Sequence, residues 1–190
     1  MSDHINIPAS AGGAAMEMDA DFRDRVKRHV EASRDAGKAV HLNRVITTAL
    51  HGFYGKAKAR RFEFFSDEPA QGGGGDEAPR PLEYFLAGFG FCQQAQYAKY
   101  AALRDIDLTG LKIDIKGYVD QRGILGIADV APGFRNIDYQ VTIETGADLD
   151  AVRELVETVE HVCPAHATIK GGTTLNRTIV VNGTELTDAP

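Results

Sequence analysis

Residues 81–107 read PLEYFLAGFGFCQQAQYAKYAALRDID, and this stretch decides the fold. The opening proline suits the first turn of a helix, where its missing N–H leaves no partner unsatisfied. Apolar side chains then recur at helical spacing, at positions 82, 85, 86, 89, 92, 97, 100 and 103. Because the first half is apolar on nearly every side, the pattern predicts a helix that is buried all round.

Two glycines interrupt this predicted helix. Gly88 and Gly90 lie in its apolar half, where glycine costs about 1 kcal/mol relative to alanine. Such a cost is typical of positions that another backbone or a ligand must approach closely.

The chain before this helix has β character and then a long loop. Residues 40–52 and 54–67 are two β-type segments that meet around Gly52 and Gly55, which predicts a hairpin. Residues 67–81, DEPAQGGGGDEAPRP, contain a glycine run and three prolines, so they predict a loop. Loops of this length are typically functional or mobile, and a plain linker is the alternative.

The chain after this helix alternates between apolar and polar residues. Residues 111–120, 122–130 and 134–146 predict three strands of an antiparallel meander. A second amphipathic helix follows from about Asp148 and should end at Pro164, before a final strand in residues 173–183. Strands in runs joined by tight turns indicate an α+β fold with antiparallel sheets around the central helix.

The first residues of the chain predict a separate extension. Residues 19–36 place Phe22, Val26 and Val30 on one stripe of a short amphipathic helix. Asp19 or Asp21 would cap it and Gly37 would stop it. We therefore divide the chain into an N-terminal extension, 1–38, and a main domain, 39–190.

Composition excludes several classes of function. A formal net charge of -6 argues against a nucleic-acid partner, and the basic cluster at 56–61 is expected on an exposed strand face. The chain lacks the run of about 20 apolar residues that spans a membrane, and it lacks a signal sequence at its start, so we expect a cytoplasmic protein with no membrane partner. The glycine run lacks the lysine of a phosphate-binding loop, and we expect no cofactor.

Two cysteines carry the chemical interest of the sequence. Cys92 lies within the predicted central helix, and Cys163 lies at the exit of the second helix in HVCPAH, 161–166. Two cysteines are too few for a disulfide framework or a four-sulfur zinc site, and buried packing is the ordinary role of a free cysteine. The position of Cys163 next to Pro164, with His161 and His166 nearby, favours a thiolate.

Two other sites remain open on the residues alone. A metal site would use four donors, which are Cys92, Cys163, His161 and His166. No CxxC or HxxxH spacing supports such a site. A Cys–His hydrolase is the second alternative, although nothing in the sequence marks an oxyanion hole.

The run DEPAQGGGGDEAPRPLEYFLAGFGFC resembles the OsmC/Ohr family of osmotically induced and organic-hydroperoxide-resistance proteins. The resemblance is carried by DEP, the glycine run, the Pro-x-Glu that ends at Glu83, and the cysteine nine positions later. The second half agrees, since a meander is followed by a helix ending in Cys-Pro. The likeness covers about residues 40–183.

The resemblance implies a thiol peroxidase for organic hydroperoxides, active in oxidative or osmotic stress. Cys92 matches the family's peroxidatic cysteine and Cys163 its resolving cysteine. A sulfenic acid would form and condense to a disulfide, which a dithiol reductant, for this family a lipoylated protein, would reopen. The family architecture is an interwoven homodimer. The alternative is a non-enzymatic dimer of the same fold that senses redox state or binds a small ligand.

Two positions depart from the active family pattern. Members with strong organic-hydroperoxide activity carry an arginine in the turn of the first hairpin, where this chain has Phe53. They also carry a glutamate directly after the helix-opening proline, whereas here Glu83 lies one step further along. The chain therefore resembles the general OsmC-like branch. We expect Arg60 or Arg61 to hold Cys92 as a thiolate, and Glu83 either to orient that arginine or to favour the helix N-terminus.

Overall fold

The computed structural model describes residues 16–34, 40–181 and 184–186. Its helices are α1 (Ala20–Ala32), α2 (Pro81–Leu103), α3 (Gln121–Ile124), α4 (Leu149–Val162) and α5 (Pro164–Gly171), with a 3-10 turn η2 (Ala70–Gly72). Its strands are β1 (Ile46–His51), β2 (Tyr54–Ala59), β3 (Phe62–Ser66), β4 (Leu108–Tyr118), β5 (Asn136–Thr145), β6 (Ile179–Val181) and β7 (Thr184–Leu186). All the sheets are antiparallel, which confirms the α+β class.

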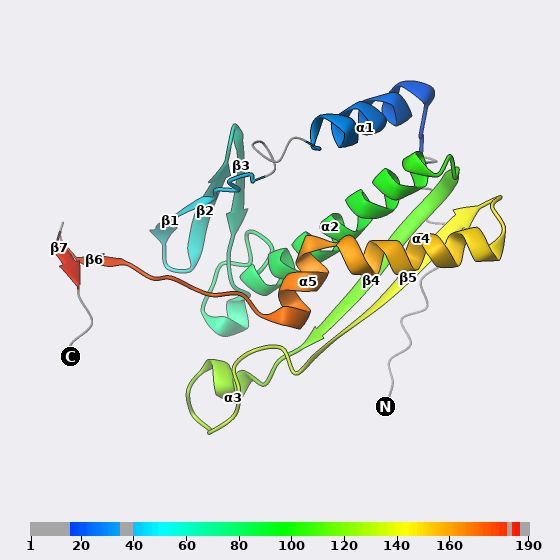
Figure 1. Cartoon of the computed structure of the whole chain (residues 1–190). Coiled ribbons are helices and arrows are strands. Elements are labelled where there is room, and N and C mark those ends of the chain that lie inside the picture. The colour runs from blue at the N-terminus through cyan, green and yellow to red at the C-terminus, as the bar shows by residue number, and fades with distance from the viewer. Residues whose placement is uncertain (1–15, 35–39, 182–183, 187–190) are drawn as a thin grey trace, which may run out of the picture.

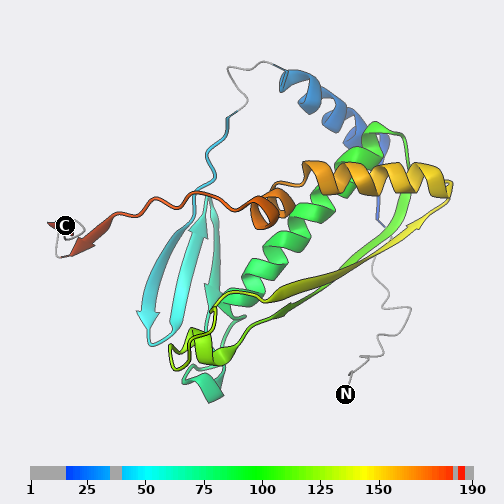
Figure 2. The ribbon, with the colours of Figure 1, turned by 60° about the horizontal axis from the view of Figure 1, so that its bottom comes forward.

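Helix α2 is the centre of the molecule and packs against β4, α4, α5 and α1 (Figures 1 and 2). It begins at Pro81, as the sequence predicts. At this start the Glu83 carboxylate reaches back and accepts the Arg80 backbone amide at 2.9 Å. The main core lies where α2 meets β4 and α4, and consists of Tyr97, Ala101, Ile106, Leu108, Leu155 and Val159.

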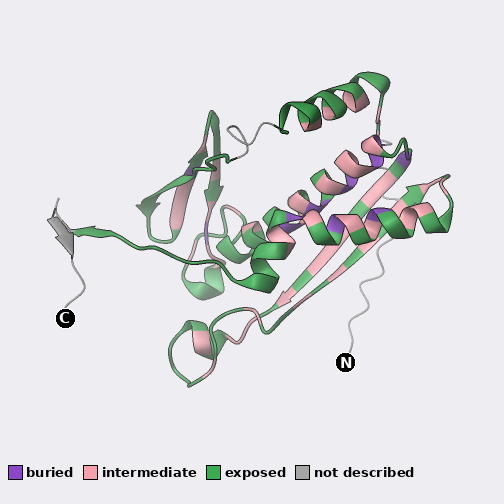
Figure 3. Cartoon of the chain, in the orientation of Figure 1, coloured by how far each residue is buried: buried purple, intermediate pink, exposed green. Residues whose placement is uncertain are grey.

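The prediction that the first half of α2 is buried all round is wrong for the single chain. Leu82, Phe85 and Phe91 are 40%, 49% and 69% exposed. In Figure 3 the exposed (green) parts of α2 lie mostly in its first half, while the second half is mostly intermediate (pink) or buried (purple). Large apolar side chains of α2 are therefore exposed in the single chain.

The two glycines of α2 differ in their surroundings. A Cβ on Gly90 would lie 2.9 Å from Cδ1 of Ile115 on β4, so this glycine makes room for the end of a side chain rather than for the backbone or ligand that the sequence predicts. A Cβ on Gly88 would meet nothing within 4 Å. The chain itself therefore explains Gly90 but gives no reason for Gly88.

The first sheet has three strands, in the order β1-β2-β3, rather than the two of a simple hairpin. The segment 54–67 is broken at Arg60, which adopts a left-handed conformation with φ 56°. Ala59 pairs with Phe62, so Arg60 and Arg61 form the turn. The expectation that the basic cluster lies on one strand is therefore wrong for these two arginines.

The second sheet contains only β4 and β5, and the predicted strand at 122–130 is wrong. This segment forms α3 and a turn instead. The Asp120 carboxylate accepts the amide of Arg122 at 3.0 Å and starts the helical turn. Gly126 then adopts φ 66°, and Gly123 packs so tightly that a Cβ would lie 2.7 Å from the Val130 oxygen. These local contacts override the apolar alternation of the segment.

The C-terminal part confirms one prediction and corrects another. Helix α4 is capped by Asp148, whose side chain accepts the Ala151 amide at 2.8 Å, and it ends before Pro164 as predicted. A short helix, α5, which the sequence analysis did not predict, follows at once. The final strand is shorter than predicted, because β6 begins at Ile179 and pairs only with β7 (Figure 1). Residues 182 and 183 lie outside the described part.

Helix α1 confirms the predicted N-terminal helix. Its cap is Asp19, which accepts the Phe22 amide at 2.6 Å, and Gly37 lies outside the described residues. Arg23 ties α1 to the turn after α2 through the Ile106 carbonyl at 3.4 Å and an ion pair with Asp107. Among the described residues, none of the helices is both long and apolar enough to cross a membrane.

Candidate functional site

The fold brings the two cysteines together from positions 71 residues apart in the sequence. Cys92 lies on α2 and Cys163 lies at the end of α4, and their sulfurs are 3.6 Å apart. A disulfide bond measures about 2.05 Å, so the two thiols are unbonded neighbours. The thiols can therefore close into a bond through a small movement.

Cys163 lies at a joint between two helices. It is the C-cap of α4 and the N-cap of α5, with extended backbone at φ -70° and ψ 116°. Its side chain is fully buried. Burial raises the pKa of the Cys163 thiol, and the neighbouring Cys92 raises it further, while the backbone amides of His166 and Ala165 lower it without reversing the shift.

Cys92 differs from Cys163 in its access to solvent. It is half-buried, whereas Cys163 has no exposed surface. A molecule that approaches from solvent therefore meets Cys92 first. Phe91 next to it is exposed, and Phe85 on the same helix stacks on Phe134 with ring centroids 5.6 Å apart, so the approach is apolar.

Two tyrosines lie on the inner side of the thiol pair. The Tyr139 ring meets Phe89 edge-on at 5.2 Å. Burial, followed by the nearby Tyr139, Glu160 and Cys163, raises the pKa of Tyr97 to about 12. Burial also raises the pKa of Tyr139, as do Glu160 and Cys163. Both phenols are therefore neutral hydrogen-bond donors at physiological pH.

Glu83 is paired with an arginine that the sequence analysis did not select. Its carboxylate accepts the Arg80 backbone amide at 2.9 Å and the Arg80 side chain at 3.1 and 2.8 Å. The Arg80 amide, together with the Arg80 guanidinium, holds the pKa of Glu83 below its usual value. Spacing of three residues across a helix start could have indicated this pair.

Arg60 contacts Phe62 rather than Glu83 or Arg80. It is exposed on the β2–β3 turn, with its guanidinium 5.2 Å from the centre of the Phe62 ring. Within the described part of the chain, no hydrogen bond or ion pair joins Arg60 to Cys92 or Glu83. The structure thus brings together Cys92 and Cys163 but adds neither Arg60 nor Glu83 to their contacts.

The histidines near Cys163 make no cluster with the sulfurs. Nδ1 of His166 lies 2.7 Å from the Glu160 carbonyl and donates a hydrogen bond to it. In the part of the chain that the structure describes, no three potential ligands lie together in a way that could hold a metal ion.

The glycine-rich loop before α2 is ordered around Asp67, which is 2% exposed. The Asp67 carboxylate accepts the amides of Glu68, Gly75 and Glu77 at 2.8, 2.9 and 3.3 Å. Burial alone would raise the pKa of Asp67, but these amides outweigh burial and lower it. The loop therefore holds the start of α2 in a fixed position.

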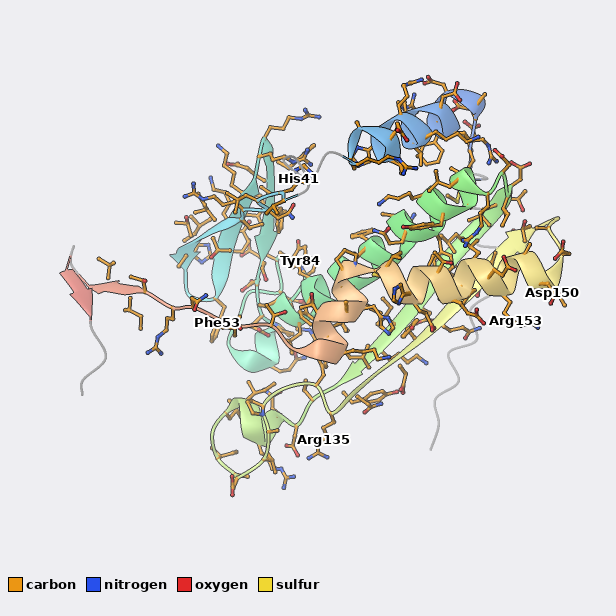
Figure 4. The ribbon with its side chains drawn as sticks, viewed as in Figure 1. His41, Phe53, Tyr84, Arg135, Asp150 and Arg153 are labelled. Carbon is orange, nitrogen blue, oxygen red and sulfur yellow. The ribbon has the colours of Figure 1, made fainter. Side chains whose placement is uncertain are left out.

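A pocket of about 750 Å³ lies between the start of α2 and the β4–β5 connection. Phe53, which Figure 4 labels at the β1–β2 turn, forms part of its wall. Most of the wall is apolar, including Leu82, Leu86, Ile124, Leu125 and Phe134, and Arg80, Glu83, Glu68 and Gln121 supply polar groups.

Comparisons with known proteins bear on the family and the fold of the chain. Residues 73–177 match the family model described as OsmC-like protein. A hydroperoxide reductase of Mycoplasma genitalium is 32% identical over 91 residues, which are 48% of this chain and 62% of that protein. The match thus spans less than two thirds of the relative's length.

Solved structures share the fold. An OsmC-like protein from Mycoplasma pneumoniae superposes with a TM-score of 0.61 at 20% identity, over 70% of this chain and 89% of that one. An organic hydroperoxide resistance protein from Legionella pneumophila gives a TM-score of 0.53 at 22% identity, over 70% and 93% of the two chains. At these identities the likeness concerns the fold.

Proposed function

This chain belongs to the OsmC-like protein family, and on that premise we propose that it is a cytoplasmic thiol peroxidase that reduces organic hydroperoxides under oxidative or osmotic stress. The observation that carries the proposal is the 3.6 Å separation between the sulfurs of Cys92 and Cys163. Two thiols at this distance, one half-exposed and one buried, form a natural pair of first and second reactants.

Cys92 reacts first in the proposed cycle. Its thiolate attacks one oxygen of the hydroperoxide, the O–O bond breaks, and the departing alkoxide takes a proton and leaves as the alcohol. Cys92 then carries a sulfenic acid. Apolar surroundings from Phe85 and Phe91 favour a peroxide with an organic group.

Cys163 completes the oxidative half of the cycle. Its sulfur attacks the sulfur of Cys92, the S–O bond breaks, and the proton of the Cys163 thiol leaves with the hydroxide as water. The product is a disulfide between the two residues. A dithiol reductant, which we propose to be a lipoylated protein, supplies two electrons and restores both thiols.

The expectation that an arginine holds Cys92 as a thiolate stays a prediction. Glu83 is engaged with Arg80, so we propose Arg80, in place of Arg60, as the arginine that Glu83 orients. Substitutions Arg80→Lys and Arg60→Lys test this choice, because only the first should remove the two side-chain hydrogen bonds to Glu83 and bring the pKa of Glu83 closer to its usual value in an NMR titration.

A second copy of the chain is the proposed cover for the exposed apolar side chains of α2. Leu82 and Phe85 lie on one side of α2 and Phe91 on another, and all three are exposed; a homodimer that wraps around the helix would bury them. Sedimentation equilibrium measures this directly, and a monomer at micromolar concentration would contradict the proposal.

Thiol counting tests the proposed reaction. Reduced protein is mixed with one equivalent of cumene hydroperoxide, and the remaining thiols are titrated with Ellman's reagent. The proposal expects loss of both thiols, and expects that Cys92→Ser leaves Cys163 unreacted. Slow loss of thiols, or loss that does not depend on Cys92, would refute it.

The pocket of about 750 Å³ favours one alternative, a dimer that binds a small ligand without turnover. Its mostly apolar wall and few polar groups are typical of ligand sites. Under this alternative, Leu86→Trp would abolish ligand binding, and cumene hydroperoxide would leave the two thiols unreacted.

A further inference from the structure

Gln93 is a buried polar residue with no partner, directly after Cys92. Its side chain is fully buried. Neither the nitrogen nor the oxygen of its carboxamide has a hydrogen-bond partner among the described residues. Buried polar groups are nearly always paired, so an unpaired one marks a place where a partner forms in another state of the molecule.

The position of Gln93 directs its side chain toward the surroundings of Cys163. Phe89, Gln93 and Tyr97 follow one another at intervals of four and share one face of α2. Phe89 contacts Tyr139 on this face. Tyr97 packs in the same core cluster as Val159 of α4, whose carbonyl accepts the Cys163 amide at 3.0 Å, so Gln93 lies on the face of α2 that meets the end of α4.

Cys163 needs a hydrogen-bond donor when it reacts. A thiol attacks as the thiolate, and a fully buried thiolate needs donors. The backbone amides of His166 and Ala165 favour the thiolate but do not offset its burial, so a further donor would ease its ionisation. The titratable groups around it are Cys92 and Tyr97 of α2, Tyr139 of β5, Glu160 of α4 and His166 of α5. The phenol of Tyr139 is already engaged with Glu160, and Nδ1 of His166 already donates to the Glu160 carbonyl. The phenol of Tyr97 is a neutral donor, so the test variants must single out Gln93.

We infer that Gln93 is a positioning residue for the second step, and that its carboxamide N–H donates to the sulfur of Cys163 as that thiol ionises. The role in turnover rests on the proposed peroxidase function. Gln93 gains and loses no proton: the proton of Cys163 leaves with the hydroxide displaced from Cys92. In the reduced protein the neutral thiol makes no such demand, and the carboxamide is unpaired.

Titration of Cys163 alone tests this inference without any peroxidase activity. Because the chain has two cysteines, Cys92→Ser leaves one, and the shift of its 13C-labelled Cβ follows ionisation by NMR. Adding Gln93→Met, which keeps the size of the side chain and removes the donor, should move the titration midpoint to higher pH. Gln94→Met, at the exposed neighbouring position, should leave the midpoint unchanged.

Kinetic measurements on the protein that keeps both cysteines give a second test of the role of Gln93. Gln93→Met should form the sulfenic acid at the wild-type rate and close the disulfide about tenfold more slowly, as expected for loss of a hydrogen bond to a charged group. Its melting temperature should equal or exceed that of the wild type, since an unpaired buried amide is removed.

The outcomes separate the two proposals. An unchanged titration midpoint in the Cys92→Ser, Gln93→Met protein overturns the role of Gln93, whatever the peroxidase activity. A raised midpoint in a protein whose wild type ignores peroxide leaves Gln93 as the donor to Cys163 and refutes the proposed function alone.

Discussion

Substitution Gly74→Ala adds a methyl group where the folded loop has no space for it. The ideal Cβ would overlap the carbonyl oxygen of Glu68 and lie 2.5 Å from its carbon. These are backbone atoms, which cannot rotate aside as the end of a side chain does. The loop must shift, and it must loosen the amides of Gly75 and Glu77 that the Asp67 carboxylate accepts.

Overpacking of this kind costs about 1–3 kcal/mol. Because about 1 kcal/mol moves the melting temperature of a domain of this size by about 2–4 °C, Gly74→Ala should lower it by about 2–12 °C in thermal unfolding followed by circular dichroism. Gly72→Ala is the matched control in the same loop, since its Cβ would meet only the Glu68 Cβ, at 4.0 Å. Equal melting temperatures for the two variants would refute the reasoning.

Three further outcomes are expected. The pKa of Asp67 is lower in the folded chain than in the unfolded one, so the Asp67 carboxylate stabilises the fold at pH values above its unfolded pKa. This stabilisation is lost as the pH falls through the lower folded pKa, so the melting temperature should drop below about pH 4. Asp67→Asn should flatten that drop, and an unchanged profile would contradict the prediction. Cys163→Ser should leave Cys92 without a resolving partner, so excess cumene hydroperoxide should carry it to the sulfinic acid, a gain of about 32 Da in the intact mass; the wild type should form the disulfide instead. Leu155→Ala, at a fully buried position of α4, should cost about 2–5 kcal/mol in urea unfolding, while Leu149→Ala, at a position 79% exposed, should cost less than about 0.5 kcal/mol.

Sequence patterns predicted the helices well where their signals were local. Pro81 and the apolar spacing after it located the start of α2, and Asp148 with Pro164 located both ends of α4. Such signals depend on residues close in sequence, so they locate the ends of a helix whatever the rest of the chain packs against it. The segment 122–130 failed because short apolar alternation does not distinguish a strand from a tight turn rich in glycine.

The site was less predictable than the helices. The meeting of Cys92 and Cys163 followed from the family resemblance and not from any spacing, because it depends on how α4 crosses α2. Gln93 gave no signal, since a glutamine in a helix is ordinarily exposed and its burial depends on the packing of α2. Arg60 was expected on a strand. It lies in a turn because it adopts a positive φ, and an arginine gives no sequence signal for that conformation.

The joint at Cys163 has a consequence for motion. Proline at the next position has no N–H, so the ladder of backbone hydrogen bonds is interrupted just after the thiol. The sulfur can therefore swing toward Cys92 by a small rotation of one extended residue, while α4 keeps its place in the core. Such a rotation would be felt first at the start of α5, because Pro164 is its first residue.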